Sequence, residues 1–187
     1  MENLKQQWKS ILGTTAFLLA VCAVVTLAVA GTYVGTADRI AEQERIMLAA
    51  SMGRLIEADQ YDVVLYDAMG APKVYRATMD DGTVRGHLIL TGGRGYGGTV
   101  YVMTGITDGV VVGVEIINAA GETPGLGLNI QDASFRAQFA GVDGSPELIR
   151  SGVAGHNQIQ SLAGATVSVY AVVLAVRDAL VVYAELS

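Results

Sequence analysis

The sequence predicts an α+β protein in which a single N-terminal transmembrane helix precedes one domain with a mostly antiparallel sheet and flanking helices. Three observations support this class. A long uncharged apolar run stands near the N-terminus, short β-branched segments fill the middle of the chain, and helical patterns come only after them. Strands that precede helices, rather than alternate with them, are typical of α+β folds and not of βαβ units.

Composition limits the classes of function. With residues 1–36 assigned to a tail and anchor, residues 37–187 suffice for a single domain. The net charge is −6 and no basic block stands outside the N-terminal tail, so we expect no nucleic-acid partner. Cys22 is the only cysteine, which excludes an intramolecular disulfide and a thiolate metal cluster ligated by this chain alone. His87 and His156 lack partners at metal-ligand spacing, so we expect no metal site.

The first element is the apolar run. No charged residue occurs between Ser10 and Ala37, and its core, residues 11–34, is apolar throughout except for scattered Thr, Gly and Tyr. At 1.5 Å per residue a helix of this core is about 36 Å long, which spans a bilayer. A signal peptide cleaved after residues 28–30 is the alternative, but the run is long for a signal. A lipobox ending at Cys22 is disfavoured because the residue before it, Val21, is bulky.

The charges around this run predict its direction. Lys5 and Lys9 precede the run beside Trp8, whereas Asp38 begins a segment of mixed charge. The positive-inside rule then predicts a single-pass protein of the cell membrane, with a cytoplasmic N-terminus and an extracytoplasmic domain.

An amphipathic helix is expected next, over residues 37–58. Ile40, Ile46, Met47 and Met52 recur there at near-helical spacing among charged residues. Short strands are expected to follow, because β-branched and aromatic residues between Gly, Asp or Pro signals are typical of strands. These strands cover residues 61–68, 73–79 and 85–91.

A hairpin is the clearest β signal in the chain. Residues 99–106 and 110–118 flank Thr107-Asp108-Gly109, and Asp-Gly supplies the positive φ that a tight hairpin turn requires. Two helices are expected after it, over residues 132–140 and about 167–185. The second has an apolar stripe formed by Val172, Val173, Val176, Leu180 and Val181.

Three glycine-rich stretches are the candidates for a binding site. They are GGRGYGG (residues 92–98), GETPGLG (121–127) and AGATVS (163–168). Glycine lets a backbone come close to a ligand. The spacing of the first stretch does not match a dinucleotide-binding or P-loop fingerprint.

The third stretch stands where the last helix is expected to begin. Unpaired N–H groups and the positive end of the helix dipole suit a phosphate there, and Thr166 could lie against that phosphate or be esterified to it. The alternative is that Thr166 or Ser168 simply caps the helix.

The second stretch would add polar and apolar side chains beside this phosphate site. Pro124-Gly125 predicts a type II-like turn that leaves Glu122 and Thr123 as polar groups and Leu126 as an apolar lid. A flat, partly apolar, phosphorylated ligand suits the combination, and flavin mononucleotide (FMN) meets that description.

These stretches, together with residues 93–130, FRAQFAG and SLAGATVSVYAVVLAV, resemble the FMN-binding domain shared by the G subunit of Rnf complexes and the C subunit of sodium-pumping NADH:quinone reductase. The quinone reductase subunit is usually longer than this chain, which favours the Rnf subunit. The resemblance implies that Thr166 carries FMN through a phosphoester, with Gly164 and Ala165 supplying close backbone. It also implies that the ETPGLG loop contacts the flavin, through Glu122, Thr123, Pro124, Gly125, Leu126 and Gly127.

The resemblance further implies an electron-transfer subunit of a membrane-bound, ion-translocating Rnf-type ferredoxin:NAD oxidoreductase complex. Such a protein is a redox carrier and not a catalyst on its own, so no catalytic residue is nominated. The implied partners are the other membrane subunits of the complex, a flavin transferase that attaches the FMN, and the lipid bilayer.

Three positions depart from the family's pattern. Gln160 and Ala163 stand where the family usually has Asp and Ser or Thr before the flavinylated threonine, and Ala120 replaces a usual His. A flavin-free scaffold protein of the complex is therefore one alternative. An anchored flavoprotein of another extracytoplasmic electron-transfer chain is the other.

Overall fold

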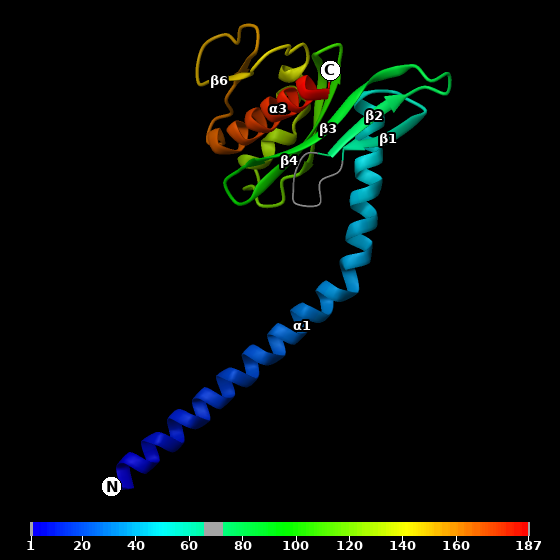
Figure 1. The fold of residues 1–187 in the computed structure, drawn as a ribbon. Coiled ribbons are helices and arrows are strands. Elements are labelled where there is room, and N and C mark those ends of the chain that lie inside the picture. Colours follow the sequence, from blue (N-terminus) through cyan, green and yellow to red (C-terminus); the bar gives the residue numbers. More distant parts are fainter. Residues whose placement is uncertain (1, 66–72, 187) are drawn as a thin grey trace. The chain divides into compact units, whose positions relative to one another are not determined.

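The computed structural model describes residues 2–65 and 73–186, and it divides into two compact units, Met1–Arg45 and Ile46–Ser187. Helix α1 runs without interruption from Glu2 to Leu55, so the expected anchor and the expected amphipathic helix are parts of one helix (Figure 1). Within it, Ile11–Thr36 is long and apolar enough to cross a membrane, and every side chain of this segment is exposed. An anchor in residues 1–36 stays a prediction.

A five-stranded antiparallel sheet forms the centre of the second unit, with its strands in sequence order. The strands are β1 (Gln60–Leu65), β2 (Lys73–Thr78), β3 (Val84–Arg94), β4 (Thr99–Thr107) and β5 (Val110–Asn118). The antiparallel sheet and the α+β class are thus confirmed. The end of the first expected strand, residues 66–68, lies outside the described residues.

The β4–β5 hairpin follows the sequence prediction closely. Thr107 pairs with Val110, and the two residues between them, Asp108 and Gly109, have φ values of 52° and 80°. Two consecutive positive φ angles are the signature of a type I′ turn, whose twist matches that of the flanking strands.

Side chains of the strands alternate between two cores, one on each face of the sheet, as the period of two requires. On one face Ile89 and Val102 pack with helix α3 (Thr166–Leu186), while on the other Leu88 and Met103 pack with the end of α1. Helix α3 comes very close to β3, since a Cβ at Gly93 would overlap the carbonyl group of Ala171.

The end of α1 is also held by charge. Glu115 of β5 is mostly buried and receives the guanidinium of Arg54 at 3.2 Å and that of Arg136 on its other oxygen. A single carboxylate therefore joins α1 and the helical region after β5 to the sheet.

The helix expected over residues 132–140 is wrong in form. The structure has a chain of short pieces, namely η1 (Gly127–Gln131), α2 (Ala133–Arg136) and η2 (Ala137–Phe139). Phe135 and Phe139 have helical spacing, and both are buried with their rings edge to face at 5.5 Å. The chain is thus helical over residues 133–139, as one α turn followed by one 3₁₀ turn, with both rings in the core.

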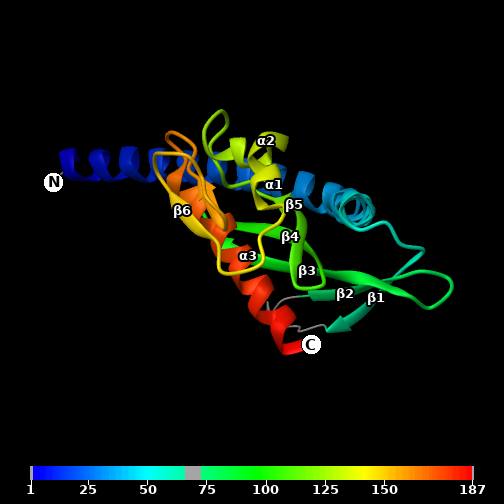
Figure 2. The same cartoon turned by 90° about the horizontal axis from the view of Figure 1, so that it is seen from above.

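Two short strands were not expected from the sequence. β6 (Glu147–Ile149) and β7 (Gln158–Gln160) pair in parallel and lie beside α3 (Figure 2). The helix expected over 167–185 is confirmed as α3. It too is apolar and long enough to cross a membrane, but nearly half of it is buried, and its Val169, Val172 and Val176 fill the core against the sheet.

Candidate functional site

The three glycine-rich stretches of the sequence come together at one end of α3. Gly97 and Gly121 approach so closely that a Cβ on either would overlap the backbone of the other. Gly164 has a φ of +75°, and a Cβ there would lie 3.0 Å from Leu126 Cδ2. Only glycine permits these approaches, so the glycines serve to join the stretches to one another.

Glu122 links the stretches through hydrogen bonds. Its side chain is buried, one carboxylate oxygen accepts the backbone N–H of Tyr96 at 2.8 Å, and the other accepts the hydroxyl of Ser168. Gly95 and Gly127 leave the room that this carboxylate occupies. Charge-assisted bonds of this kind are stronger than neutral ones, so Glu122 acts as a clasp between the three stretches.

The ETPGLG stretch makes the expected turn. The N–H of Leu126 donates to the carbonyl oxygen of Thr123 at 3.2 Å, and Gly125 has a φ of +73°, as position three of a type II turn requires. Thr123, Pro124, Gly125 and Leu126 are exposed on this turn, whereas Gly127 is buried beneath it.

Thr166 is the first residue of α3 and is half-buried. The N–H of Val169 donates to the carbonyl oxygen of Ala165 at 2.9 Å, so the capping position is Ala165 and not Thr166. Ser168 gives its hydroxyl to Glu122. The interpretation of Thr166 or Ser168 as a helix cap is therefore wrong. The hydroxyl of Ser161 lies next to Thr166 and donates to its Oγ1 at 3.4 Å.

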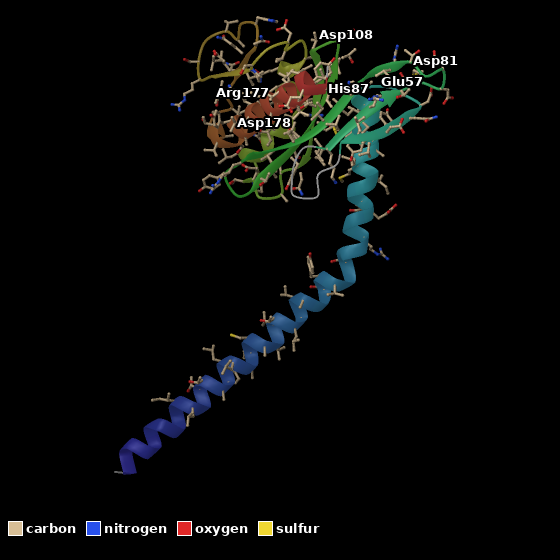
Figure 3. All side chains as sticks on the ribbon, in the orientation of Figure 1. Glu57, Asp81, His87, Asp108, Arg177 and Asp178 are labelled. Carbon is tan, nitrogen blue, oxygen red and sulfur yellow. The ribbon has the colours of Figure 1, made fainter. Side chains whose placement is uncertain are left out.

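A groove of about 550 Å³ opens beside Thr166. It lies between β6 and α3, and its lining residues are Glu147, Leu148, Arg150, Thr166, Val167, Tyr170 and Arg177. Figure 3 labels Arg177 on α3. The volume of the groove falls in the range of small-molecule sites, and its walls combine apolar, aromatic and cationic side chains.

The structure thus brings the expected site residues together but divides their roles. Glu122 is engaged in the clasp and does not line the groove, and Gly164 and Ala165 form the approach to α3. Thr166 alone among them lines the groove. A phosphate on Thr166 would meet the free N–H groups of the first turn of α3, and a flat apolar ring would meet the groove, so the residues present fit FMN.

Three residues of this region were missed from the sequence. The sequence pattern gives Ser168 no role beyond capping, and it places Tyr170 and Arg177 in an apolar helix. Arg177 carried a signal, because a cation inside the helix run VVLAVRDALVV needs a reason to be there.

The titratable groups elsewhere have ordinary structural partners. His156 lies 2.7 Å from Asp143, and hydrogen bonds from Asn157 and then His156 lower the pKa of this carboxyl. Burial, followed by the charge of Arg76, lowers the pKa of His87. Among the side chains that the structure describes, no three of His, Cys, Asp or Glu gather as a metal site.

Two known family models match parts of the chain. Residues 1–55 match the RnfG N-terminal region, and residues 95–181 match the FMN-binding domain.

Similar proteins cover nearly all of the chain. One is the G subunit of the Na(+)-translocating ferredoxin:NAD(+) oxidoreductase complex of Acetobacterium woodii, 31% identical over 100% of this chain and 98% of that protein. Another is the G subunit of the proton-translocating ferredoxin:NAD(+) oxidoreductase complex of Clostridium ljungdahlii, 28% identical over 91% of this chain and 90% of that protein.

Solved structures share the fold. The C subunit of the Na(+)-translocating NADH-quinone reductase from Parabacteroides distasonis aligns with a TM-score of 0.53 and 22% identity, over 65% of this chain and 70% of that one. NqrC of Shewanella oneidensis aligns with a TM-score of 0.50 and 22% identity, over 56% of this chain and 53% of that one.

Proposed function

This chain belongs to the RnfG family, the G subunits of ion-translocating Rnf oxidoreductase complexes, and from this premise we propose that it carries FMN covalently on Thr166 and relays electrons within such a complex. The partners of the chain are then the other membrane subunits of the complex. Its anchor lies in residues 1–36, its N-terminus is cytoplasmic and its domain extracytoplasmic.

One observation carries the assignment of Thr166. This residue lines a groove of about 550 Å³, close to the point where Glu122 joins the three glycine-rich stretches. Among the residues proposed for the site, only Thr166 combines a nucleophilic oxygen, a helix N-terminus and an adjacent cavity.

The bound FMN would supply the electron-transfer chemistry, and the protein would bind and orient it. Attachment is a substitution at phosphorus. The Thr166 oxygen replaces one substituent of a flavin nucleotide presented by a flavin transferase, and the Thr166 proton leaves with the displaced group. Ser161 lies 3.4 Å from that oxygen and is suited to orienting it.

Intact mass tests the attachment. We expect the full chain, expressed with a flavin transferase, to gain the mass of FMN less water and to fluoresce in a denaturing gel. Thr166→Ala should lose both signals, while Ser151→Ala, which removes an exposed hydroxyl, should keep them. An unmodified wild-type chain beside a modified control protein would contradict the proposal and favour the flavin-free scaffold.

Labelling tests the orientation. Because Cys22 is the only cysteine, a Cys22→Ala, Ser151→Cys chain has one thiol in an exposed loop. A membrane-impermeant maleimide should label it in intact cells. Labelling only after lysis would place the domain in the cytoplasm.

Co-purification with other membrane subunits then separates an Rnf-type complex from another electron-transfer chain.

A further inference from the structure

A tight turn brings Ser161 beside Thr166. Strand β7 ends just before Ser161, and the N–H of Ala165 then donates to the carbonyl oxygen of Leu162 at 3.1 Å. Gly164, the third residue of this turn, has a φ of +75°, as a type II turn requires. The turn reverses the chain, so the residue before it and the residue after it lie side by side, with 3.4 Å between their hydroxyl oxygens.

The backbone on the Ser161 side of the turn is fixed by two other parts of the chain. The N–H of Ser161 donates to the carbonyl oxygen of Ile149 in β6 at 2.8 Å. The N–H of Gln160 donates to the side-chain oxygen of Gln138 at 2.7 Å. Leu162, the next residue along, packs against the core. The fold therefore keeps the half-buried Ser161 side chain next to Thr166.

The Ser161 hydroxyl has one proton and two weak acceptors. Its oxygen lies 3.4 Å from Thr166 Oγ1 and 3.5 Å from the carbonyl oxygen of Leu162. Hydrogen bonds between two oxygens are most often about 2.7 Å long, so both of these contacts are weak. A hydroxyl rotates to suit its best acceptor, and a charged phosphate oxygen is a better acceptor than either of the present ones.

We propose that Ser161 is a phosphate-binding residue, whose hydroxyl donates to the phosphate that links the flavin nucleotide to Thr166. This inference rests on the proposed function. The non-bridging oxygens of that phosphate are two bonds from Thr166 Oγ1, and the Ser161 hydroxyl is already next to that atom. Among residues 160–165, Ser161 is the only one with a hydroxyl. It thus adds a side-chain donor to the free N–H groups of the first turn of α3.

The contact acts during attachment as well as after it. The Thr166 oxygen bonds to the flavin phosphorus of a flavin dinucleotide, and the anhydride bond breaks. Its electron pair leaves with the other nucleotide, which also takes the Thr166 proton. Nothing is oxidised or reduced, and Ser161 keeps its proton. A hydroxyl that donates to the phosphoryl oxygens stabilises the charge on them in the transition state, so Ser161 speeds the chemical step.

The test measures the rate of FMN attachment to the full chain in detergent, with a flavin transferase and a flavin dinucleotide. Ser161→Ala should lower kcat about tenfold and leave KM for the chain unchanged, because the lost donor acts in the chemical step and not in docking. Ser161→Thr, which keeps a hydroxyl, should recover most of the rate. Ser151→Ala, which removes an exposed hydroxyl elsewhere, should change neither constant.

A second measurement reports on the contact in the loaded chain. The ³¹P resonance of the phosphoester should shift in Ser161→Ala, because the phosphate loses a hydrogen bond, and should keep its wild-type position in Ser151→Ala. Urea unfolding of the unloaded chains serves as the control for folding. Ser161→Ala should have the same urea midpoint as wild type.

The outcomes separate the two proposals. A wild-type kcat in Ser161→Ala, together with an unshifted ³¹P resonance, would overturn the phosphate contact and leave attachment at Thr166 intact. A change in KM alone would also overturn the contact, since docking would then explain the effect. If Ser161→Ala does not fold, Ser161→Cys, whose thiol is a weak donor, replaces it in both measurements. A wild-type chain that gains no FMN beside a modified control protein would overturn both proposals.

Discussion

Two hollows of the folded domain differ in size and in chemistry. The groove beside Thr166 has a volume of about 550 Å³, whereas a pocket of about 710 Å³ lies at the start of β3, lined by residues that include Glu57, His87 and Asp108. Figure 3 labels these three residues.

Some lining residues of the larger pocket contact one another. The His87 ring meets the Tyr183 ring edge to face at 5.6 Å, and the Thr107 hydroxyl donates to the carbonyl oxygen of Arg85 at 3.0 Å. The smaller groove is lined by Thr166, which belongs to one of the three converging glycine-rich stretches, and by Arg177. The close backbone approaches beside Thr166, and not volume, distinguish the candidate site.

The first prediction concerns the close approach of Gly97 and Gly121, near Thr166. Gly97→Ala places a Cβ over the carbonyl group of Gly121, and since backbone cannot move aside as a side chain can, we expect a loss of about 3 kcal/mol in unfolding free energy. Urea unfolding of the full chain in detergent measures it. Gly98→Ala is the matched control, because its Cβ would meet nothing within 4 Å. Equal stability of the two variants would contradict this close approach.

The second prediction concerns the hydrogen bonds of the Glu122 carboxylate. Glu122→Ala leaves the N–H of Tyr96 and the hydroxyl of Ser168 without their acceptor, which should cost about 2 kcal/mol. Glu57→Ala removes an exposed carboxylate from the larger pocket and should leave the urea midpoint unchanged. If both variants have the same urea midpoint as wild type, Glu122 does not hold the three stretches together.

The third prediction concerns the hairpin turn next to the larger pocket. Gly109 has a φ of +80° with open space around its Cβ position, so Gly109→Ala should cost only about 1 kcal/mol, from backbone strain alone. Gly109→Asn should be better tolerated because asparagine adopts positive φ more readily. A loss as large as that of Gly97→Ala would mean that the two ends of the sheet are equally crowded.

The smallest effect is a pH dependence at the larger pocket. Burial lowers the pKa of His87 below 6.5, so the unfolded chain binds this proton more readily than the folded one. Stability should therefore be complete above pH 6.5 and fall as the pH decreases through the lowered pKa. Thermal unfolding of His87→Gln should lose this dependence, and His156→Gln should keep it. A wild-type chain with no change over this interval would exclude the effect of burial.

Local patterns predicted some parts of the molecule well. The Asp108-Gly109 turn was predictable because positive φ is a property of the dipeptide itself, and the Pro124-Gly125 turn for the same reason. The form of residues 132–140 was not, because the spacing of Phe135 and Phe139 fits both a continuous helix and a series of short helical turns. β6 and β7 escaped prediction because three residues are too few to show a period.

The sequence by itself determined the order of elements, the apolar run of α1, the three glycine-rich stretches and the family they resemble, since each depends on residues that are neighbours along the chain. Only the tertiary structure decided what Glu122 and Arg177 do. Glu122 meets Ser168 across 46 residues, and Arg177 meets Pro146 across 31. Long-range packing alone sets which partner each of these polar groups finds.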